Sequence, residues 1–132
     1  MPNVTILVAE DDDMVRAFVC SGLRRHGYRV LEAQDGAAAL ALAERVGLRR
    51  IDLVLTDVEM PALDGIELAR CLRQLRPDVK VLHMTGSSAA RLDKLGSAGG
   101  VLQKPFAYGT LLRGVDACLS KEKTLRAEVR VS

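Results

Sequence analysis

Carboxylates, a hydroxyl and a lysine each follow directly after a short apolar run, and together these residues could do chemistry. Glu10 and Asp11 follow the first run, Asp57 the third, Thr85 the fourth and Lys104 the fifth. Carboxylates brought together in a partly desolvated cleft repel one another, and a bound hard cation relieves that repulsion. The spacing therefore predicts a metal centre of oxygen ligands, with an ammonium and a hydroxyl beside it.

The cation we expect is Mg²⁺, with Asp11 and Asp57 as direct ligands and Glu10, one methylene longer, acting through a coordinated water. The Asp57 carboxylate is also a candidate nucleophile toward phosphorus, which would give an aspartyl phosphate. The Lys104 ammonium would neutralise phosphoryl oxygens, and the Thr85 hydroxyl would donate to one of them. That donation would draw the Thr85 loop inward and turn a local charge into a surface signal.

Each of these residues also has an ordinary structural role. The acidic run at residues 11–13 can cap the helix that follows, where negative charge is favourable. Asp57 can be a turn residue, Thr85 a loop hydroxyl and Lys104 a surface lysine. Their joint placement after successive apolar runs favours the chemical interpretation.

The apolar runs alternate with longer segments of helical period, the pattern of βαβ units around a parallel sheet. Several runs are almost continuously aliphatic, as in strands buried on both faces. Ligands of open parallel sheets bind beyond the carboxyl ends of the strands, which is where the polar residues fall. The predicted strands are residues 4–9, 29–33, 53–56, 79–84 and 101–103.

Helices are indicated between the strands by apolar residues at positions i, i+3, i+4 and i+7. This spacing occurs at residues 15–22, 68–75 and 108–115. Asp35 can cap a further helix after the second strand, and Pro77 stops the third helix just past its end. A short fourth helical segment is expected at residues 89–95, before a glycine-rich stretch.

Length and composition fit one domain with an aliphatic core. The chain has 132 residues, 48% of them hydrophobic and 27% charged. Aromatic residues make up 3% with no Trp, which argues against stacking on single-stranded nucleic acid. The net charge of +2 comes from residues 121–132, so the rest is balanced and offers no polyanion-binding surface. We expect a domain over residues 1–120, a charged tail over residues 121–132 and no output domain.

The three cysteines, Cys20, Cys71 and Cys118, are odd in number and far apart, so neither a disulfide framework nor a metal motif is predicted. The first residues lack the basic region and long apolar stretch of a secretion signal, and no membrane span is predicted. We expect a cytoplasmic protein that binds neither membranes nor nucleic acid directly.

Four ordered motifs stand in the predicted strand contexts. They are ILVAEDD at residues 6–12, DLVLTDVEMP at residues 52–61 with Asp64-Gly65 after it, VLHMT at residues 81–85, and QKPF at residues 103–106. Together they resemble the receiver domain of bacterial two-component response regulators, over about residues 4–120. The resemblance implies a doubly wound, five-stranded parallel sheet, (βα)5 and flavodoxin-like, with strand order 2-1-3-4-5. It also implies a cis peptide between Lys104 and Pro105.

By this resemblance Asp57 is the phosphoacceptor, Glu10 and Asp11 are the acidic pair, and the main-chain carbonyl of Glu59 is a further Mg²⁺ ligand. Members of the family take the phosphoryl group from the phosphohistidine of a sensor histidine kinase or phosphotransfer protein, or from acetyl phosphate. They later hydrolyse the aspartyl phosphate themselves. The implied function is a phosphorelay switch that signals to a downstream protein, rather than an enzyme.

The chain departs from the family pattern at two places. Val101 stands three residues before Lys104, where the family usually has an aromatic residue that couples to Thr85. The interval between Thr85 and Lys104 is shorter than usual, which predicts a truncated fourth helix and an altered output face. Short versions of this kind, with their LQKPF ending, resemble receivers associated with hybrid histidine kinases.

Three other functions share part of this pattern. A haloacid-dehalogenase-like phosphatase also uses an aspartyl nucleophile, but there the acidic pair follows the nucleophile, whereas Glu10 and Asp11 precede Asp57. A flavodoxin-like FMN binder needs hydroxyls and glycines after the first strand, where the carboxylates of this chain would repel phosphate. A receiver-like docking module that is never phosphorylated is suggested by Val101 and the short fourth segment. The intact Asp57, Thr85 and Lys104 argue against it.

Overall fold

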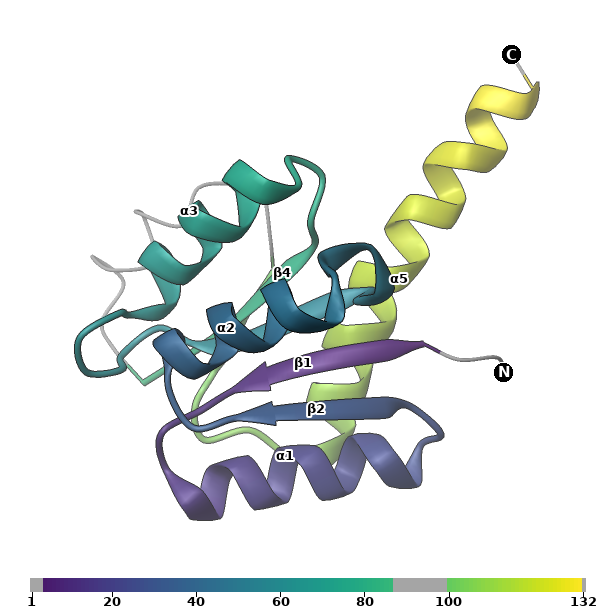
Figure 1. The fold of residues 1–132 in the computed structure, drawn as a ribbon. Coiled ribbons are helices and arrows are strands. Elements are labelled where there is room, and N and C mark those ends of the chain that lie inside the picture. The colour runs from purple at the N-terminus through teal and green to yellow at the C-terminus, as the bar shows by residue number, and fades with distance from the viewer. Residues whose placement is uncertain (1–3, 87–99, 132) are drawn as a thin grey trace.

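Five parallel strands form one sheet in the order β2-β1-β3-β4-β5, as predicted, in a computed structural model that describes residues 4–86 and 100–131. Helices cover both faces of this sheet (Figure 1). The strands are β1 (Thr5–Ala9), β2 (Arg29–Ala33), β3 (Leu53–Asp57), β4 (Val81–Thr85) and β5 (Val101–Gln103).

The helices lie in two layers. Helices α2 and α3 pack on one face of the sheet, and α1 and α5 pack on the other (Figure 1). The predicted helical segment at residues 89–95 lies outside the described residues. The helices are α1 (Asp13–Arg25), α2 (Gly36–Val46), the 3-10 turn η1 (Leu48–Arg50), α3 (Gly65–Leu75) and α5 (Tyr108–Val131).

Strand alternation sorts the aliphatic residues into two cores. Leu7 and Val54 face α2 and α3, whereas Val8 and Leu55, one position further along, face α1 and α5. Every residue of β3 and β4 is buried. The near-continuous apolar runs of these strands are therefore explained by burial on both faces.

Capping residues fix where the helices begin. Asp35 accepts the Ala38 N–H at 2.7 Å at the start of α2, as predicted. Asp64 does the same for α3, where it accepts the Glu67 N–H at 2.8 Å. Helix α3 ends two residues before Pro77, as expected.

Strand β4 begins two residues later than predicted and includes Thr85. The difference arises because Val79 donates its N–H to the Arg76 carbonyl at 3.0 Å, which holds it in the turn that follows α3. At the other end of the chain, helix α5 continues through residues 121–131, so the expected charged tail is continuous with this helix as far as Val131 (Figure 1).

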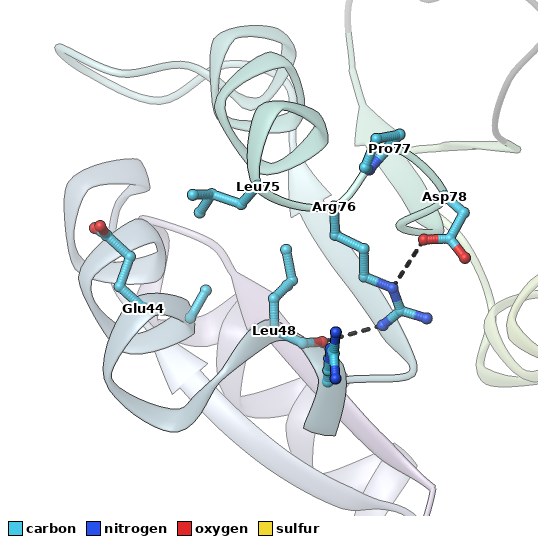
Figure 2. Close-up of a pocket in the computed structure, with 8 residues that line it drawn as sticks. Glu44, Leu48, Leu75, Arg76, Pro77 and Asp78 are labelled. Atoms are coloured by element: carbon cyan, nitrogen blue, oxygen red, sulfur yellow. Dashed lines mark hydrogen bonds and ion pairs between the residues drawn. The ribbon is translucent and has the colours of Figure 1, made fainter.

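A shallow groove lies at the amino ends of β3 and β4, between α2, η1 and the end of α3 (Figure 2). Arg76 spans it, donating to the carbonyls of Leu48 and Ile51 at 3.1 and 3.2 Å and to the Asp78 carboxylate at 3.0 Å. Among the described residues no helix is long and apolar enough to cross a membrane.

Candidate functional site

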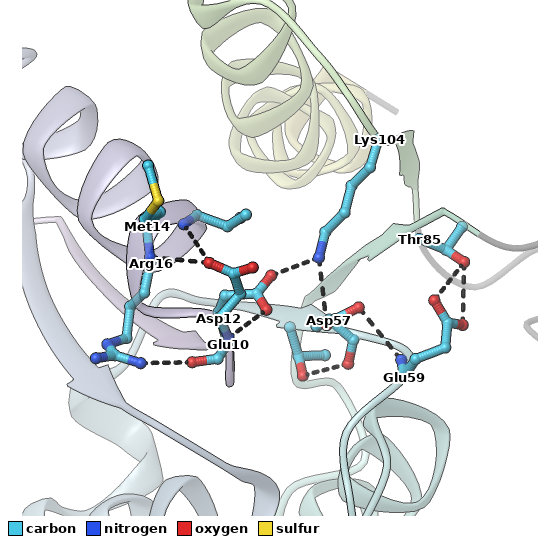
Figure 3. A network of polar contacts seen from close by, with 10 residues as sticks. Glu10, Asp12, Met14, Arg16, Asp57, Glu59, Thr85 and Lys104 are labelled. Atoms are coloured by element: carbon cyan, nitrogen blue, oxygen red, sulfur yellow. Dashed lines mark hydrogen bonds and ion pairs between the residues drawn. The ribbon is translucent and has the colours of Figure 1, made fainter.

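The side chains predicted to act together meet at the carboxyl edge of the sheet (Figure 3). Glu10 follows β1, Asp57 is the last residue of β3, Thr85 is the last residue of β4, and Lys104 follows β5. Asp11, the next residue after Glu10, is exposed. Because the parallel strands end together, residues up to 94 positions apart in the sequence come within hydrogen-bonding distance.

Lys104 joins the two buried carboxylates. Its Nζ lies 2.6 Å from Glu10 Oε1 and 3.2 Å from Asp57 Oδ2. The Glu10 side chain is fully buried, and that of Asp57 is 6% exposed. The peptide between Lys104 and Pro105 is cis, as the resemblance implied.

Three carboxylates gather around a single point. Glu10, Asp11 and Asp57 each offer one oxygen within 4.8 Å of the others. Lys104 is the ammonium that contacts this cluster among the described residues, so negative charge remains in excess. Hard oxygen donors with excess negative charge suit Mg²⁺, which binds through one or two carboxylates and keeps several waters. The donor set therefore fits the predicted ion.

The electrostatics of the site follow from burial and from this charge excess. Burial raises the pKa of Asp57 to about 7, with the Glu10 carboxylate adding to the rise and Lys104 opposing it. For Lys104, burial acts to lower the pKa, but the hydrogen bond that Lys104 donates to Glu10 and the charges of Asp57 and Glu10 outweigh it, so the pKa is raised. Lys104 thus carries its positive charge at neutral pH.

Main-chain packing holds Asp57 in position. Gly65 donates its N–H to the Val58 carbonyl at 2.9 Å, and a Cβ on Gly65 would clash with the Asp57 carbonyl. The start of α3 can therefore approach the end of β3 only because residue 65 is glycine. The Thr56 hydroxyl donates to the same Asp57 carbonyl at 3.0 Å.

The acidic run at residues 11–13 divides between the two roles considered for it. Asp12 caps α1, accepting the N–H groups of Met14 and Val15 at 2.9 and 3.1 Å. Glu10 and Asp11 instead face Asp57. The capping interpretation thus holds for Asp12, while the chemical roles of Glu10 and Asp11 stay predictions.

Arg16 fixes the acidic loop, a role that the sequence did not reveal. Its guanidinium donates to the Glu10 carbonyl at 2.9 Å and pairs with Asp13 at 2.6 Å and Glu32 at 3.6 Å. The i, i+3 spacing of Asp13 and Arg16 was a signal for the first pair, but not for the main-chain contact.

Thr85 makes a contact that was not predicted. Its buried hydroxyl donates to the Glu59 carboxylate, with both oxygens at 3.1 Å (Figure 3). Glu59 also donates its main-chain N–H to Asp57 Oδ1 at 3.2 Å. Val101, the position without the usual aromatic residue, lies in β5 opposite His83 and is 37% exposed.

The family model of the response regulator receiver domain matches residues 6–116. The chain belongs to this family. The receiver domain is 38% identical to the response regulator receiver protein CpdR of Brucella abortus, over 86% of this chain and 95% of that protein. It is 37% identical to sensor kinase CckA of the same organism, covering 91% of this chain but only 13% of CckA. Its match to response regulator MprA of Mycobacterium sp. strain KMS is 39% identical and spans 89% of this chain and 51% of MprA.

Solved structures support the same assignment. The receiver domain superposes on chemotaxis protein CheY4 of Vibrio cholerae with a TM-score of 0.82 and 30% identity, covering 89% of this chain and 100% of CheY4. TrrA of Thermotoga maritima, solved in complex with Mg²⁺ and BeF, gives a TM-score of 0.77 at 31% identity over 88% of this chain and 99% of TrrA. Family, fold and phosphorelay signalling are thus as predicted. The family match argues against the phosphatase and the flavin-binding protein.

Proposed function

We propose that Asp57 accepts the phosphoryl group and that the domain works as an Mg²⁺-dependent switch. The observation that carries this proposal is the convergence at Asp57: a buried carboxylate with the Lys104 ammonium at 3.2 Å and two further carboxylates whose oxygens lie within 4.8 Å. A buried carboxylate beside a cation and a set of hard oxygen ligands is what phosphoryl transfer to an aspartate requires.

In the proposed reaction an Asp57 carboxylate oxygen attacks phosphorus. The new O–P bond forms as the P–N bond of a phosphohistidine breaks, and the electron pair leaves with the imidazole nitrogen. Lys104 neutralises a phosphoryl oxygen, and it is charged for this task because its pKa is raised. Hydrolysis reverses the modification when water attacks the same phosphorus and the Asp57 carboxylate leaves.

Glu10, Asp11, Asp57 and the main-chain carbonyl of Glu59 would hold the Mg²⁺. When bound, the ion supplies positive charge to the phosphoryl oxygens during transfer. The chain itself positions the ligands, because Arg16 holds the Glu10 carbonyl and Gly65 permits the close packing at Asp57. In the phosphorylated state the Thr85 hydroxyl would donate to a phosphoryl oxygen.

The partner we propose is a histidine kinase or phosphotransfer protein that presents its phosphohistidine beside Lys104. An apolar surface formed by Met14, Phe18, Pro105 and Phe106 borders Lys104. Met14 is 82% and Phe18 46% exposed, and Phe18 packs against Phe106 at 6.4 Å between ring centroids. Exposed apolar residues beside Lys104 fit a transient protein donor, which would cover them during transfer.

We further propose a cytoplasmic location and an output through a downstream protein rather than nucleic acid. Cys20, Cys71 and Cys118 form no disulfide with one another, which fits a reducing compartment.

Intact mass after incubation with acetyl phosphate, with and without Mg²⁺, tests the proposal. We expect an Mg²⁺-dependent gain of one phosphoryl mass that Asp57→Asn abolishes. The matched control is Asp52→Asn at the opposite end of β3, where the carboxylate accepts the Thr5 N–H. This variant should still form the adduct. If no donor, including candidate kinases, produces an adduct while Mg²⁺ still binds, the unphosphorylated docking module replaces this proposal.

A further inference from the structure

Glu59 contacts both the reacting carboxylate and the hydroxyl expected to respond to it. Its main-chain N–H donates to Asp57 Oδ1, and its side-chain carboxylate accepts the Thr85 hydroxyl at 3.1 Å. Thr85 is fully buried, whereas Glu59 is partly exposed. The contact joins the loop after β3 to the carboxyl end of β4.

The Thr85 hydroxyl has one proton to donate. While that proton is directed at the Glu59 carboxylate, it cannot also be directed at a phosphoryl oxygen on Asp57. The two acceptors therefore compete for the same donor. Hydrogen bonds to ionised groups are stronger than those between neutral groups, so leaving Glu59 has a cost that the phosphoryl group must offset.

Charge acts in the same direction. A phosphoryl group on Asp57 brings roughly one and a half to two negative charges to the site. The Glu59 carboxylate, held inward by Thr85, then lies close to these charges and is repelled. Because Glu59 is partly exposed, its side chain can turn toward water when the Thr85 hydroxyl no longer donates to it.

We propose that the Glu59 side chain is a latch: it holds Thr85 in the unphosphorylated arrangement and lowers the affinity of the site for the phosphoryl group. This inference rests on the proposed function of Asp57 and Thr85 and adds a positioning role for Glu59. The role belongs to the side chain alone, so substitutions there leave the main-chain N–H and carbonyl in place.

Binding of fluoroberyllate, a phosphoryl mimic, at saturating Mg²⁺ measures the latch. The chain has no Trp, and ¹⁹F NMR follows the bound mimic directly. We expect Glu59→Ala to tighten binding by about tenfold, the scale of one charge-assisted hydrogen bond. Glu59→Gln keeps an acceptor but not the charge and should fall between the two. Glu44→Ala on α2 removes an exposed carboxylate at the opposite end of the sheet and should change nothing.

A double-mutant cycle with Thr85→Val decides whether the effect passes through the hydroxyl. Valine keeps the shape of threonine but has no proton to donate, so Glu59→Ala should then change fluoroberyllate affinity by less than about twofold. An equal gain in both backgrounds would overturn the latch in favour of simple repulsion, and weaker binding by Glu59→Ala would overturn it outright. If the unaltered protein binds no fluoroberyllate and forms no adduct, the proposed function fails instead.

Discussion

Charged side chains gather at both ends of the sheet, but they are balanced differently. At the amino end, Arg76 meets one carboxylate and two main-chain carbonyls, and its hydrogen bonds tie η1 to the turn after α3 (Figure 2). At the carboxyl end, the Lys104 ammonium pairs with the buried carboxylates of Glu10 and Asp57 (Figure 3). Asp11 adds a third carboxylate to this cluster. The first arrangement uses its charge to hold loops together. The second keeps an excess of negative charge that can bind an ion.

The difference teaches that convergence of polar residues does not by itself identify a site. Arg76 is almost as enclosed as Lys104, with 29% and 22% of their side chains exposed. What separates them is that Arg76 pairs with one exposed carboxylate and neutral carbonyls, whereas Lys104 joins two buried carboxylates. Buried like charges are costly, so a cluster of them is a candidate functional site.

The largest effect should come from removing the ammonium at the carboxyl end. Lys104→Met leaves the phosphoryl oxygens without their protein cation, and we expect phosphoryl transfer from acetyl phosphate to slow by about 100-fold at saturating Mg²⁺. Time courses of intact mass give the rate. Lys80→Met is the matched control, because Lys80 donates to the Cys118 carbonyl at the other end of the sheet. A loss below about threefold for Lys104→Met would limit this lysine to a structural role.

Reducing the charge excess should weaken metal binding. Asp11→Asn removes one of the three charges, and we expect the Mg²⁺ concentration for half-saturation to rise by about tenfold in calorimetric titration. Without metal the same variant should be more stable than the unaltered protein, because repulsion within the cluster falls. Asp12→Asn is the control, since asparagine caps a helix as well as aspartate does. Equal weakening by both variants would mean that residue 12 also binds the ion.

At the amino end, removal of charge should change stability and not chemistry. Arg76→Met removes the guanidinium hydrogen bonds to the carbonyls of Leu48 and Ile51, which we expect to lower the free energy of unfolding by about 1–3 kcal/mol in urea titrations. The phosphoryl-transfer rate should stay unchanged. Arg50→Met, on the exposed side of η1, should alter stability by less than about 0.5 kcal/mol. A slower transfer rate in Arg76→Met would remove the distinction between the two ends.

The strand-end rule explains how much of this could be predicted from sequence. Apolar runs predicted the positions of β1 to β5, and the polar residues after the first, third, fourth and fifth runs meet at one edge, because parallel strands end together there. The contact of Glu59 with Thr85 was not predictable in this way. It depends on the path of the loop after β3 and on side-chain rotamers, and it joins residues 26 positions apart. The Arg16 contact with the Glu10 carbonyl is similar, since no residue-type pattern marks a main-chain acceptor.

The smallest effect concerns His83, which lies between the two ends in β4. The side chain is 2% exposed, and its Nε2 has no hydrogen-bond partner in the part of the chain that the structure describes. Burial lowers the pKa of His83, with the Gly65 carbonyl opposing the shift.

As the pH falls through about 6.5, the unfolded chain therefore takes up a proton at His83 more readily than the folded protein does. Folding stability is lost below that pH, by at most about 1.4 kcal/mol per pH unit. In His83→Leu this loss should disappear. The free energy of unfolding of the variant, relative to that of the unaltered protein, should therefore be about 1 kcal/mol higher at pH 5.5 than at pH 7.5. Urea titrations across this range measure the gain. A constant difference between the two proteins would show that His83 takes up its proton equally in both states.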